Sequence, residues 1–341
     1  MVKQSNYFSN RNIKQYIHNK TDEAKFPKNA LIELSNACNH FCVFCNNPRM
    51  KRKINNLDIK VFSNFIEEAA KEGLEEVGLY ATGEPFLTKN IEKYISICKK
   101  FGVKRVYLTT NGSLASLDKV KKAYESGLDS IKFSINASNR KSYKLIHGKD
   151  DFDKVKKNLI EIYKWKNQER KKLQILCSFI YTKKTISEID EYKKVFGPFV
   201  EDINLNPAGT QGGRINSIIE KITTEKFTSN PKLIEPCEML WNRLHLTCEG
   251  FLTACCIDYD LDLVYADFKN KRVSLKKLWN NDLITKLRNK HLNNNMSKTL
   301  CKNCLYGTKE KYSKLLDVNY SKNKKIKTSN VELRTELVSQ N

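Results

Sequence analysis

The chain has 341 residues, of which 40% are hydrophobic, and its formal net charge is +23. This length and apolar content predict a globular protein with a sizeable core, built as one large domain or as one domain plus a smaller one. The N-terminal stretch has no apolar signal region and no apolar run approaches the ~20 residues of a membrane span, so we expect a cytoplasmic protein that does not span a membrane.

The positive charge is spread along the chain. Lysines recur in segments such as KVKKAYES, KVKKNL and KNKKIKTS. Because no basic stripe with interleaved aromatic residues and no known nucleic-acid module is present, the composition indicates a solvated surface more than a nucleic-acid partner. The charge leaves open an acidic or phosphorylated substrate.

Short apolar strands alternate with amphipathic helices between residue 30 and about residue 206. The expected strands span 31–36, 75–82, 103–110, 129–135, 173–182 and 202–207, and the expected helices span 57–73, 91–102, 117–127, 152–165 and 186–196. Such an alternation predicts an α/β fold with a parallel sheet covered by helices. Functional residues of these sheets gather in the loops that follow the strands.

Composition divides the chain into five regions. We expect an N-terminal segment at 1–27, the α/β core at 28–206, a Gly-, Ser- and Thr-rich linker at 207–232, a cysteine-bearing region at 233–308 and a Lys-rich tail at 309–341.

Eleven cysteines in a reducing compartment predict metal binding more than disulfides. Cys38, Cys42 and Cys45 form a C-x3-C-x2-C pattern directly after the first expected strand. A structural zinc site closes with four ligands, and His40 is one candidate for the fourth. An iron–sulfur cubane held by three thiolates instead leaves one iron free for a substrate or cofactor. The position after a strand favours the cubane.

This spacing, with Phe44 directly before the last cysteine, resembles the signature of the radical S-adenosylmethionine (SAM) enzymes. The resemblance implies a partial (β/α)6 barrel whose [4Fe–4S] cluster binds SAM through the free iron. It also implies that SAM is cleaved to a 5′-deoxyadenosyl radical, which abstracts hydrogen from the substrate, and that a donor such as flavodoxin or ferredoxin supplies the electron.

Segments after the next strands resemble the same family in its order. ATGEPF resembles the G-G-E-P segment with Thr82 in place of the commoner Gly, TTNGSL resembles the T-N-G turn, and FSINA resembles the S-x-D segment. YKLIHG carries His147 where relatives often carry Arg. The resemblance implies these cofactor-binding residues: Phe44, Gly83, Glu84, Asn111, Ser134, Asn136 and His147.

Three of these residues also have plainer interpretations. Asn111 and Gly112 suit an ordinary tight turn. Glu84 could be a solvated loop carboxylate and His147 an exposed loop histidine. Cys98 and Cys177 lie on apolar faces, so we expect them to be buried in the core.

The segment 237–258 predicts a β-hairpin that turns at Glu249-Gly250, followed by a helical segment at 273–292 and the CKNC pair at 301–304. This arrangement resembles the SPASM extension, or its shorter twitch form, which binds auxiliary [4Fe–4S] clusters. Since only one closing C-x2-C pair is present, the resemblance implies one auxiliary cluster, ligated by Cys237, Cys255, Cys301 and Cys304.

Several alternatives remain for this region. Cys256 competes with Cys255, because neighbouring side chains of a strand point to opposite faces. Cys248 is the substitute for Cys237, and a structural zinc knuckle is the alternative to iron and sulfur.

The resemblance implies a radical SAM oxidoreductase that abstracts hydrogen from an unactivated C–H bond. We expect net oxidation of a small molecule such as a sugar or alcohol, through the auxiliary cluster. One alternative is a radical SAM/SPASM maturase that modifies a peptide or protein. Another is a zinc-stapled basic protein that binds nucleic acid. No residue stands out as the general base, and the sequence does not name the substrate.

Overall fold

The structure is a computed structural model that describes residues 20–224, 234–323 and 334. Parts of four predicted regions lie outside the described residues: most of the N-terminal segment 1–27, the end of the linker 207–232, the first residue of the cysteine-bearing region 233–308 and much of the tail 309–341. Within the described ranges, no helix is both long enough and apolar enough to cross a membrane.

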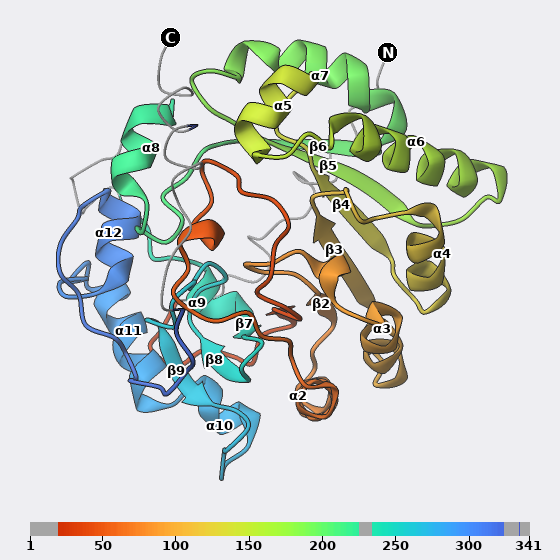
Figure 1. Ribbon diagram of the computed structural model, residues 1–341. Coiled ribbons are helices and arrows are strands. Elements are labelled where there is room, and N and C mark those ends of the chain that lie inside the picture. The colour runs from red at the N-terminus through yellow and green to blue at the C-terminus, as the bar shows by residue number, and fades with distance from the viewer. Residues whose placement is uncertain (1–19, 225–233, 324–333, 335–341) are drawn as a thin grey trace.

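The described residues form one nine-stranded sheet in the order β6-β5-β4-β3-β2-β1-β7-β8-β9. Neighbours among the first six strands pair in parallel, which confirms the predicted α/β fold with a parallel core (Figure 1). These strands are β1 (Asn29–Ile32), β2 (Glu76–Gly78), β3 (Arg105–Thr110), β4 (Ser130–Ser134), β5 (Gln174–Tyr181) and β6 (Asp202–Pro207).

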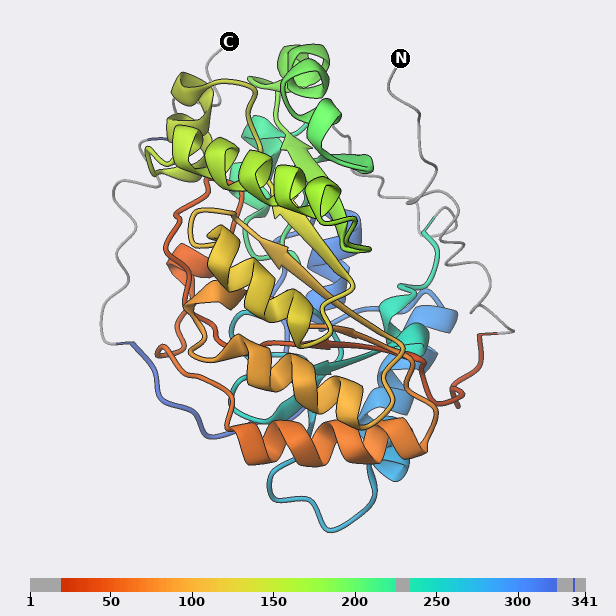
Figure 2. The same ribbon diagram turned by 90° about the vertical axis from the view of Figure 1, so that its right-hand side faces the viewer.

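Helices between these strands cover the outer face of the sheet, and Figure 2 shows α2, α3, α4 and α6 stacked along it. They are α2 (Ile59–Lys71), α3 (Ile91–Lys100), α4 (Leu117–Glu125), α5 (Arg140–His147), α6 (Phe152–Gln168) and α7 (Ile189–Phe196). In α2, Phe62, Phe65 and Ile66 form the buried stripe, and the Asp58 side chain caps the first turn by accepting from the backbone N–H of Lys60.

Helix α5 was not expected from the sequence. The Asn139 side chain caps its first turn by accepting from the backbone N–H of Ser142, and Gly148 ends it in the left-handed conformation. Its last turn places Ile146 and His147 under the cysteine loop.

The predicted hairpin consists of β7 (Arg243–Leu246) and β8 (Phe251–Thr253), which are antiparallel with Leu246 opposite Leu252. Strand β7 also pairs in parallel with β1, and β9 (Val264–Asp267) adds to β8. The cysteine-bearing region therefore continues the core sheet. Local sequence patterns predicted the hairpin, but they carry no signal for a pairing between strands so far apart in the chain.

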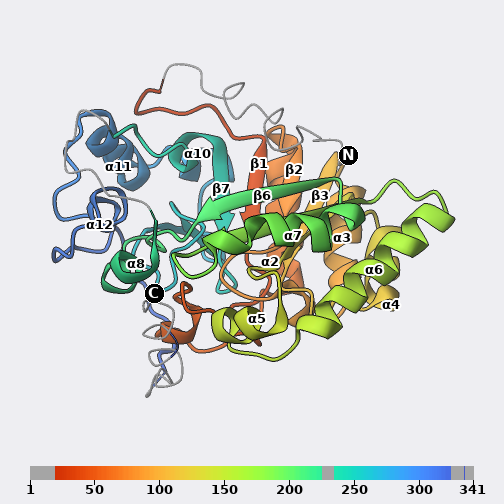
Figure 3. The ribbon, with the colours of Figure 1, turned by 90° about the horizontal axis from the view of Figure 1, so that it is seen from above.

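The remaining helices lie on the side of the molecule away from α4 and α6 (Figure 3). They are α8 (Asn216–Ile222), α9 (Met239–Asn242), α10 (Leu275–Trp279), α11 (Asp282–Leu292) and α12 (Leu300–Tyr306). The single helical segment expected at 273–292 is wrong in one respect: it is two helices, because Asn281 caps α11 by accepting from the backbone N–H groups of Leu283 and Ile284.

Strand β1 contributes to the apolar core and leads into a buried polar network. Ala30 and Ile32 of β1 belong to the main core under the helices, together with Cys98 and Cys177. Both cysteines are 0% exposed, as predicted. Glu33 follows β1, and its side chain lies in a buried polar network at the carboxyl ends of the strands.

Candidate functional site

The loop after β1 carries Cys38, Cys42 and Cys45, and its backbone is fixed to the end of α5. The N–H of Phe41 donates to the carbonyl of His147 at 2.9 Å, and the N–H of Val43 donates to the carbonyl of Ile146 at 3.0 Å. Because thiolates are the ligands of iron–sulfur clusters, this fixed loop is a suitable frame for a metal centre.

Burial raises the pKa of all three loop thiols, that of Cys38 to about 12. The protein alone therefore does not stabilise them as thiolates, whereas metal coordination deprotonates a thiol outright. Among the described residues, the three sulfurs do not form a group in which all ligand atoms lie within 4.8 Å of one another. One zinc ion at about 2.3 Å from each sulfur needs a tighter set, whereas a cubane spreads its thiolates over different irons.

The zinc alternative with His40 meets a second obstacle. His40, Cys42 and His147 do place their ligand atoms within 4.8 Å of one another. However, the backbone N–H of Asn136 donates to Nε2 of His147 at 3.1 Å. A neutral histidine that binds a metal through Nδ1 carries its proton on Nε2, where it would face this N–H. The geometry therefore suits a hydrogen-bonded pair of rings more than a metal site.

Gly83 lies at the end of the second strand unit, in close contact with the cysteine loop. A Cβ atom at Gly83 would lie 2.2 Å from the carbonyl oxygen of Ser35 and 2.6 Å from that of Ala37. The next residue, Glu84, donates its N–H to the same Ala37 carbonyl at 2.7 Å. The ATGEPF segment therefore needs glycine at this position to approach the loop.

The carboxylate of Glu84 joins two strand ends. It is 2% exposed and accepts from Thr110 Oγ1 at 2.6 Å, from the N–H of Asn111 at 2.8 Å and from the N–H of Phe86 at 3.1 Å. Burial raises its pKa, although these three donors oppose the shift. Glu84 is thus a buried brace between ATGEPF and TTNGSL, not a solvated loop carboxylate.

Asn111 connects the third strand end to the cysteine loop. Its Nδ2 donates to Asn39 Oδ1 at 2.8 Å, and Asn39 Nδ2 donates to Ser113 Oγ at 2.8 Å. The turn interpretation and the site interpretation are both compatible with this geometry. Asn39 was not singled out from the sequence, although it lies between two of the predicted ligands.

The other residues expected to bind the cofactor lie in three different settings. Ser134 shares a hydrogen bond with Ser178 at 3.2 Å, between β4 and β5. Phe44 is 5% exposed and packs in an apolar cluster with residues of α8 such as Ile219 and Ile222. His147 is 1% exposed, so it is not the exposed loop histidine considered above. Direct contacts of these side chains with SAM stay predictions.

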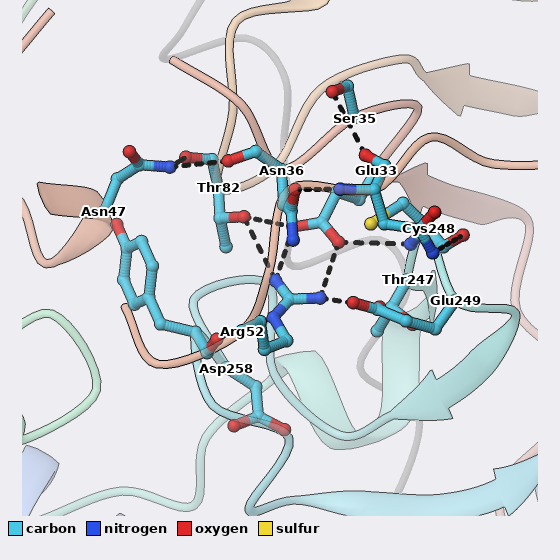
Figure 4. A network of polar contacts seen from close by, with 12 residues as sticks. Glu33, Ser35, Asn36, Asn47, Arg52, Thr82, Thr247, Cys248, Glu249 and Asp258 are labelled. Atoms are coloured by element: carbon cyan, nitrogen blue, oxygen red, sulfur yellow. Dashed lines mark hydrogen bonds and ion pairs between the residues drawn. The ribbon is translucent and has the colours of Figure 1, made fainter. Parts of the chain in front are cut away.

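A buried ionic network was missed by sequence reasoning (Figure 4). Arg52 is 1% exposed and makes a bidentate ion pair with Glu33. Its Nη1 and Nη2 lie 2.9 and 2.8 Å from the two carboxylate oxygens. Nη1 also lies 2.7 Å from Glu249 in the turn of the β7–β8 hairpin, and Nε donates to the carbonyl of Tyr259 at 2.7 Å. Arg52 therefore joins the cysteine loop to the C-terminal region.

This network explains why Thr82 stands where the family commonly has Gly. Its hydroxyl donates to Glu33 and accepts from Nη2 of Arg52. Its carbonyl accepts from Asn47 Nδ2 at 2.7 Å. The one signal for the network in the sequence was Glu33, a carboxylate beside an apolar strand, which needs a partner when buried.

The cysteines expected to hold the auxiliary cluster come from three segments. Cys237 precedes α9, Cys255 follows β8, and Cys301 and Cys304 lie on α12. Burial raises the pKa of Cys301, with smaller contributions from the charges of Cys237 and Cys304. Within the described ranges, none of the four belongs to a group of three or more ligand atoms that all lie within 4.8 Å of one another. This spread again fits a cubane better than one zinc ion.

The argument that separated Cys255 from Cys256 by strand alternation is wrong. Strand β8 ends at Thr253, and both cysteines lie in the turn-rich segment after it. Their thiols share a hydrogen bond, and both line a small cavity with His245. The G-x4-C spacing still favours Cys255 as the ligand. Cys248 lies beside Glu33 and Glu249 in the Arg52 network, which does not favour it as a substitute for Cys237.

Family models match the two regions that carry these cysteines. The model described as "Radical SAM superfamily" matches residues 32–191. Residues 32–191 are therefore a radical SAM domain. A second model, "Iron-sulfur cluster-binding domain", the SPASM domain, matches residues 237–305. These domains bind SAM and [4Fe–4S] clusters, as expected from the sequence.

Two curated relatives match part of the chain. "Uncharacterized protein MJ0804" of Methanocaldococcus jannaschii is 35% identical over 38% of this chain and 41% of its own length. A "Probable GTP 3′,8-cyclase" of Sulfurisphaera tokodaii is 31% identical over 47% of this chain and 49% of its own. The chain thus spans less than half the length of each.

Solved structures share the fold at low identity. BtrN in complex with AdoMet and 2-DOIA is 18% identical, with a TM-score of 0.58 over 85% of this chain and 98% of BtrN. SuiB of Streptococcus suis bound to precursor peptide SuiA is 17% identical, with a TM-score of 0.60 over 77% of this chain and 67% of SuiB. Radical SAM enzymes with SPASM-type extensions therefore share the architecture of this chain.

Proposed function

We propose that this radical SAM enzyme oxidises a small polar molecule at an unactivated C–H bond, with an electron-accepting cluster held by the SPASM cysteines. One observation carries the proposal. The hydroxyl of Tyr259, in the segment that follows Cys255 and Cys256, lies 3.4 Å from Sγ of Cys45. The two cysteine groups are thus connected by one short segment, a suitable arrangement for electron transfer between two centres.

We assign Cys38, Cys42 and Cys45 as the ligands of the SAM-binding cluster, and Cys237, Cys255, Cys301 and Cys304 as those of the auxiliary cluster. When bound, the first cluster and SAM supply the 5′-deoxyadenosyl radical. Three protein ligands leave room for SAM, and four ligands close the auxiliary centre to substrate. A closed centre suits the acceptance of an electron.

The chain's own residues position these groups. The close approach of Gly83 to the Ser35 and Ala37 carbonyls holds the ATGEPF backbone against the cysteine loop. Glu84 and Asn39 tie that segment and the loop to the third strand end. We propose that the backbone of 82–84 receives the methionine amino group of SAM at this junction.

A small substrate is favoured over a peptide by the extent of the structural likeness. BtrN, whose structure contains 2-DOIA, matches over 98% of its length, whereas SuiB, whose structure contains a precursor peptide, matches over 67%. The relatives named "Probable GTP 3′,8-cyclase" make GTP a second candidate substrate. The net charge of +23 suits an anionic substrate and an acidic electron donor such as flavodoxin or ferredoxin.

The test is a substrate panel with anaerobically purified protein, SAM and dithionite. Deuterated aminocyclitols and sugar alcohols, a deuterated peptide and deuterated GTP are supplied separately. We expect deuterium in 5′-deoxyadenosine, and a carbonyl product, only with a small alcohol. Transfer only from the peptide or only from GTP would overturn the small-molecule assignment. A zinc protein without iron would overturn the enzyme itself.

A further inference from the structure

The ring of His147 is enclosed beneath the cysteine loop. It is 1% exposed and stacks on Tyr143, with ring centroids 4.0 Å apart and planes at 11°. Its Nδ1 lies 3.6 Å from Sγ of Cys42 and 3.2 Å from Nδ1 of His40. A buried ring nitrogen at this distance from a predicted iron ligand raises the question of whether it carries a proton.

The backbone N–H of Asn136 determines which nitrogen of the His147 ring carries the proton. Its N–H donates to Nε2 of His147 at 3.1 Å. A backbone N–H can only donate, so Nε2 holds a lone pair, and the proton of the ring is on Nδ1. The Asn136 side chain agrees, because its Oδ1 accepts from the N–H of Ile180 at 2.7 Å, which leaves the Nδ2 donor facing His147 at 3.2 Å.

The partner of His40 fixes the second ring in the same way. Nε2 of His40 lies 3.2 Å from Oδ2 of Asp151. A carboxylate accepts, so the proton of His40 is on Nε2, and its Nδ1 has only a lone pair. The Nδ1–H of His147 therefore points between the Nδ1 lone pair of His40 and the sulfur of Cys42. When Cys42 is a thiolate, its charge strengthens the N–H···S bond.

We propose that His147 is a positioning residue that donates this N–H···S hydrogen bond to Cys42 and raises the reduction potential of the SAM-binding cluster. The inference rests on the proposed function, in which Cys42 is a cluster ligand. Hydrogen bonds to cluster sulfurs stabilise the more negative, reduced state and so set the potential. This role would account for a histidine at position 147, where the family more commonly has Arg.

The test is the midpoint potential of the N-terminal cluster, measured without SAM by EPR-monitored redox titration. His147→Phe keeps the stack on Tyr143 and removes the donor. We expect its potential to fall, with the reduction equilibrium shifted about tenfold, which for one electron is about 59 mV. His147→Gln supplies an amide donor and should restore part of the shift. Tyr143→Phe is the matched control, because the Tyr143 hydroxyl has no hydrogen-bond partner in the described chain, and its potential should equal that of the wild type.

Two outcomes separate this inference from the proposed function. A His147→Phe protein that holds its cluster at an unchanged potential would overturn the role of His147 and leave the enzyme assignment intact. A wild-type protein without a cluster on the N-terminal loop would overturn both. If His147→Phe loses the cluster, pulsed EPR of the wild type labelled with 15N-histidine decides. A weakly coupled histidine nitrogen is expected, because the ring is hydrogen-bonded to the sulfur and is not an iron ligand, and its absence would overturn the inference.

Discussion

Arg52 and Glu33 form a buried, two-pronged ion pair at the point where the radical SAM core meets the SPASM domain. Its two N···O distances are 2.9 and 2.8 Å, and both side chains are at most 2% exposed. Arg52 follows the cysteine loop, Glu33 comes directly after β1, and the third member, Glu249, belongs to the hairpin turn. The pair therefore ties the SAM-binding loop to the domain that we expect to accept electrons.

Replacing Arg52 should destabilise the whole protein. Arg52→Met leaves the charge of Glu33 buried without a partner, and such a loss typically costs about 3 kcal/mol or more. Urea unfolding measures the change. Lys71→Met removes the exposed pair of Lys71 with Glu67 and should alter the free energy of unfolding by less than about 0.5 kcal/mol. Equal stability of the two variants would show that the network contributes little.

The same pair predicts a pH dependence. Burial by itself raises the pKa of Glu33, but the Arg52 guanidinium outweighs it, and the folded-state pKa is about 2, below the ordinary 4.5. The contribution of the pair is therefore complete above pH 4.5 and is lost as the pH falls toward 2. We expect the difference in unfolding free energy between wild type and Arg52→Met to narrow below pH 4.5. A difference that is constant down to about pH 3 would contradict this account.

Gly83→Ala should prevent normal assembly of the site. The added Cβ would lie 2.2 Å from the Ser35 carbonyl oxygen, and backbone atoms cannot move aside as a flexible side chain can. We expect Gly83→Ala to lose SAM binding, and isothermal titration calorimetry measures this loss. Gly73→Ala is the steric control, because a Cβ there meets nothing within 4 Å, although its positive φ adds some backbone strain. If Gly83→Ala bound SAM as tightly as the wild type, the close approach of Gly83 to the cysteine loop would not be needed for SAM binding.

Glu84→Gln should weaken SAM binding more than cluster assembly. The amide keeps the size of the side chain but places an NH2 group where the carboxylate accepts from Thr110, Asn111 and Phe86. One or two of these donors would then lose their acceptor, at about 1–3 kcal/mol each. Iron analysis should be near the wild-type value while the Kd for SAM rises. An unchanged Kd would argue against placing this strand end at the cofactor.

The strand-end motifs could be predicted because the carboxyl ends of parallel strands meet at one edge of the sheet. Gly83, Glu84 and Asn111 come from two different units and lie together for this reason. The partners of Arg52 could not be predicted, because Glu249 is far along the chain and only the parallel pairing of β7 with β1 brings it near. For the same reason, the sequence did not predict that the C-terminal strands continue the core sheet. Cys255 and Cys256 were misjudged because strand β8 ends earlier than the pattern indicated.

The most direct test of the central claim is iron and sulfide analysis with Mössbauer spectroscopy on three anaerobically reconstituted proteins. The wild type should hold about eight irons per chain, as two cubanes require. Cys38→Ala/Cys42→Ala/Cys45→Ala and Cys301→Ala/Cys304→Ala should each hold about half of this, and only the second should still cleave SAM to 5′-deoxyadenosine. Cys98→Ala and Cys177→Ala, which alter core residues, are the controls and should keep the full iron content. Two complete cubanes in either multiple variant, or SAM cleavage by the first, would contradict the account.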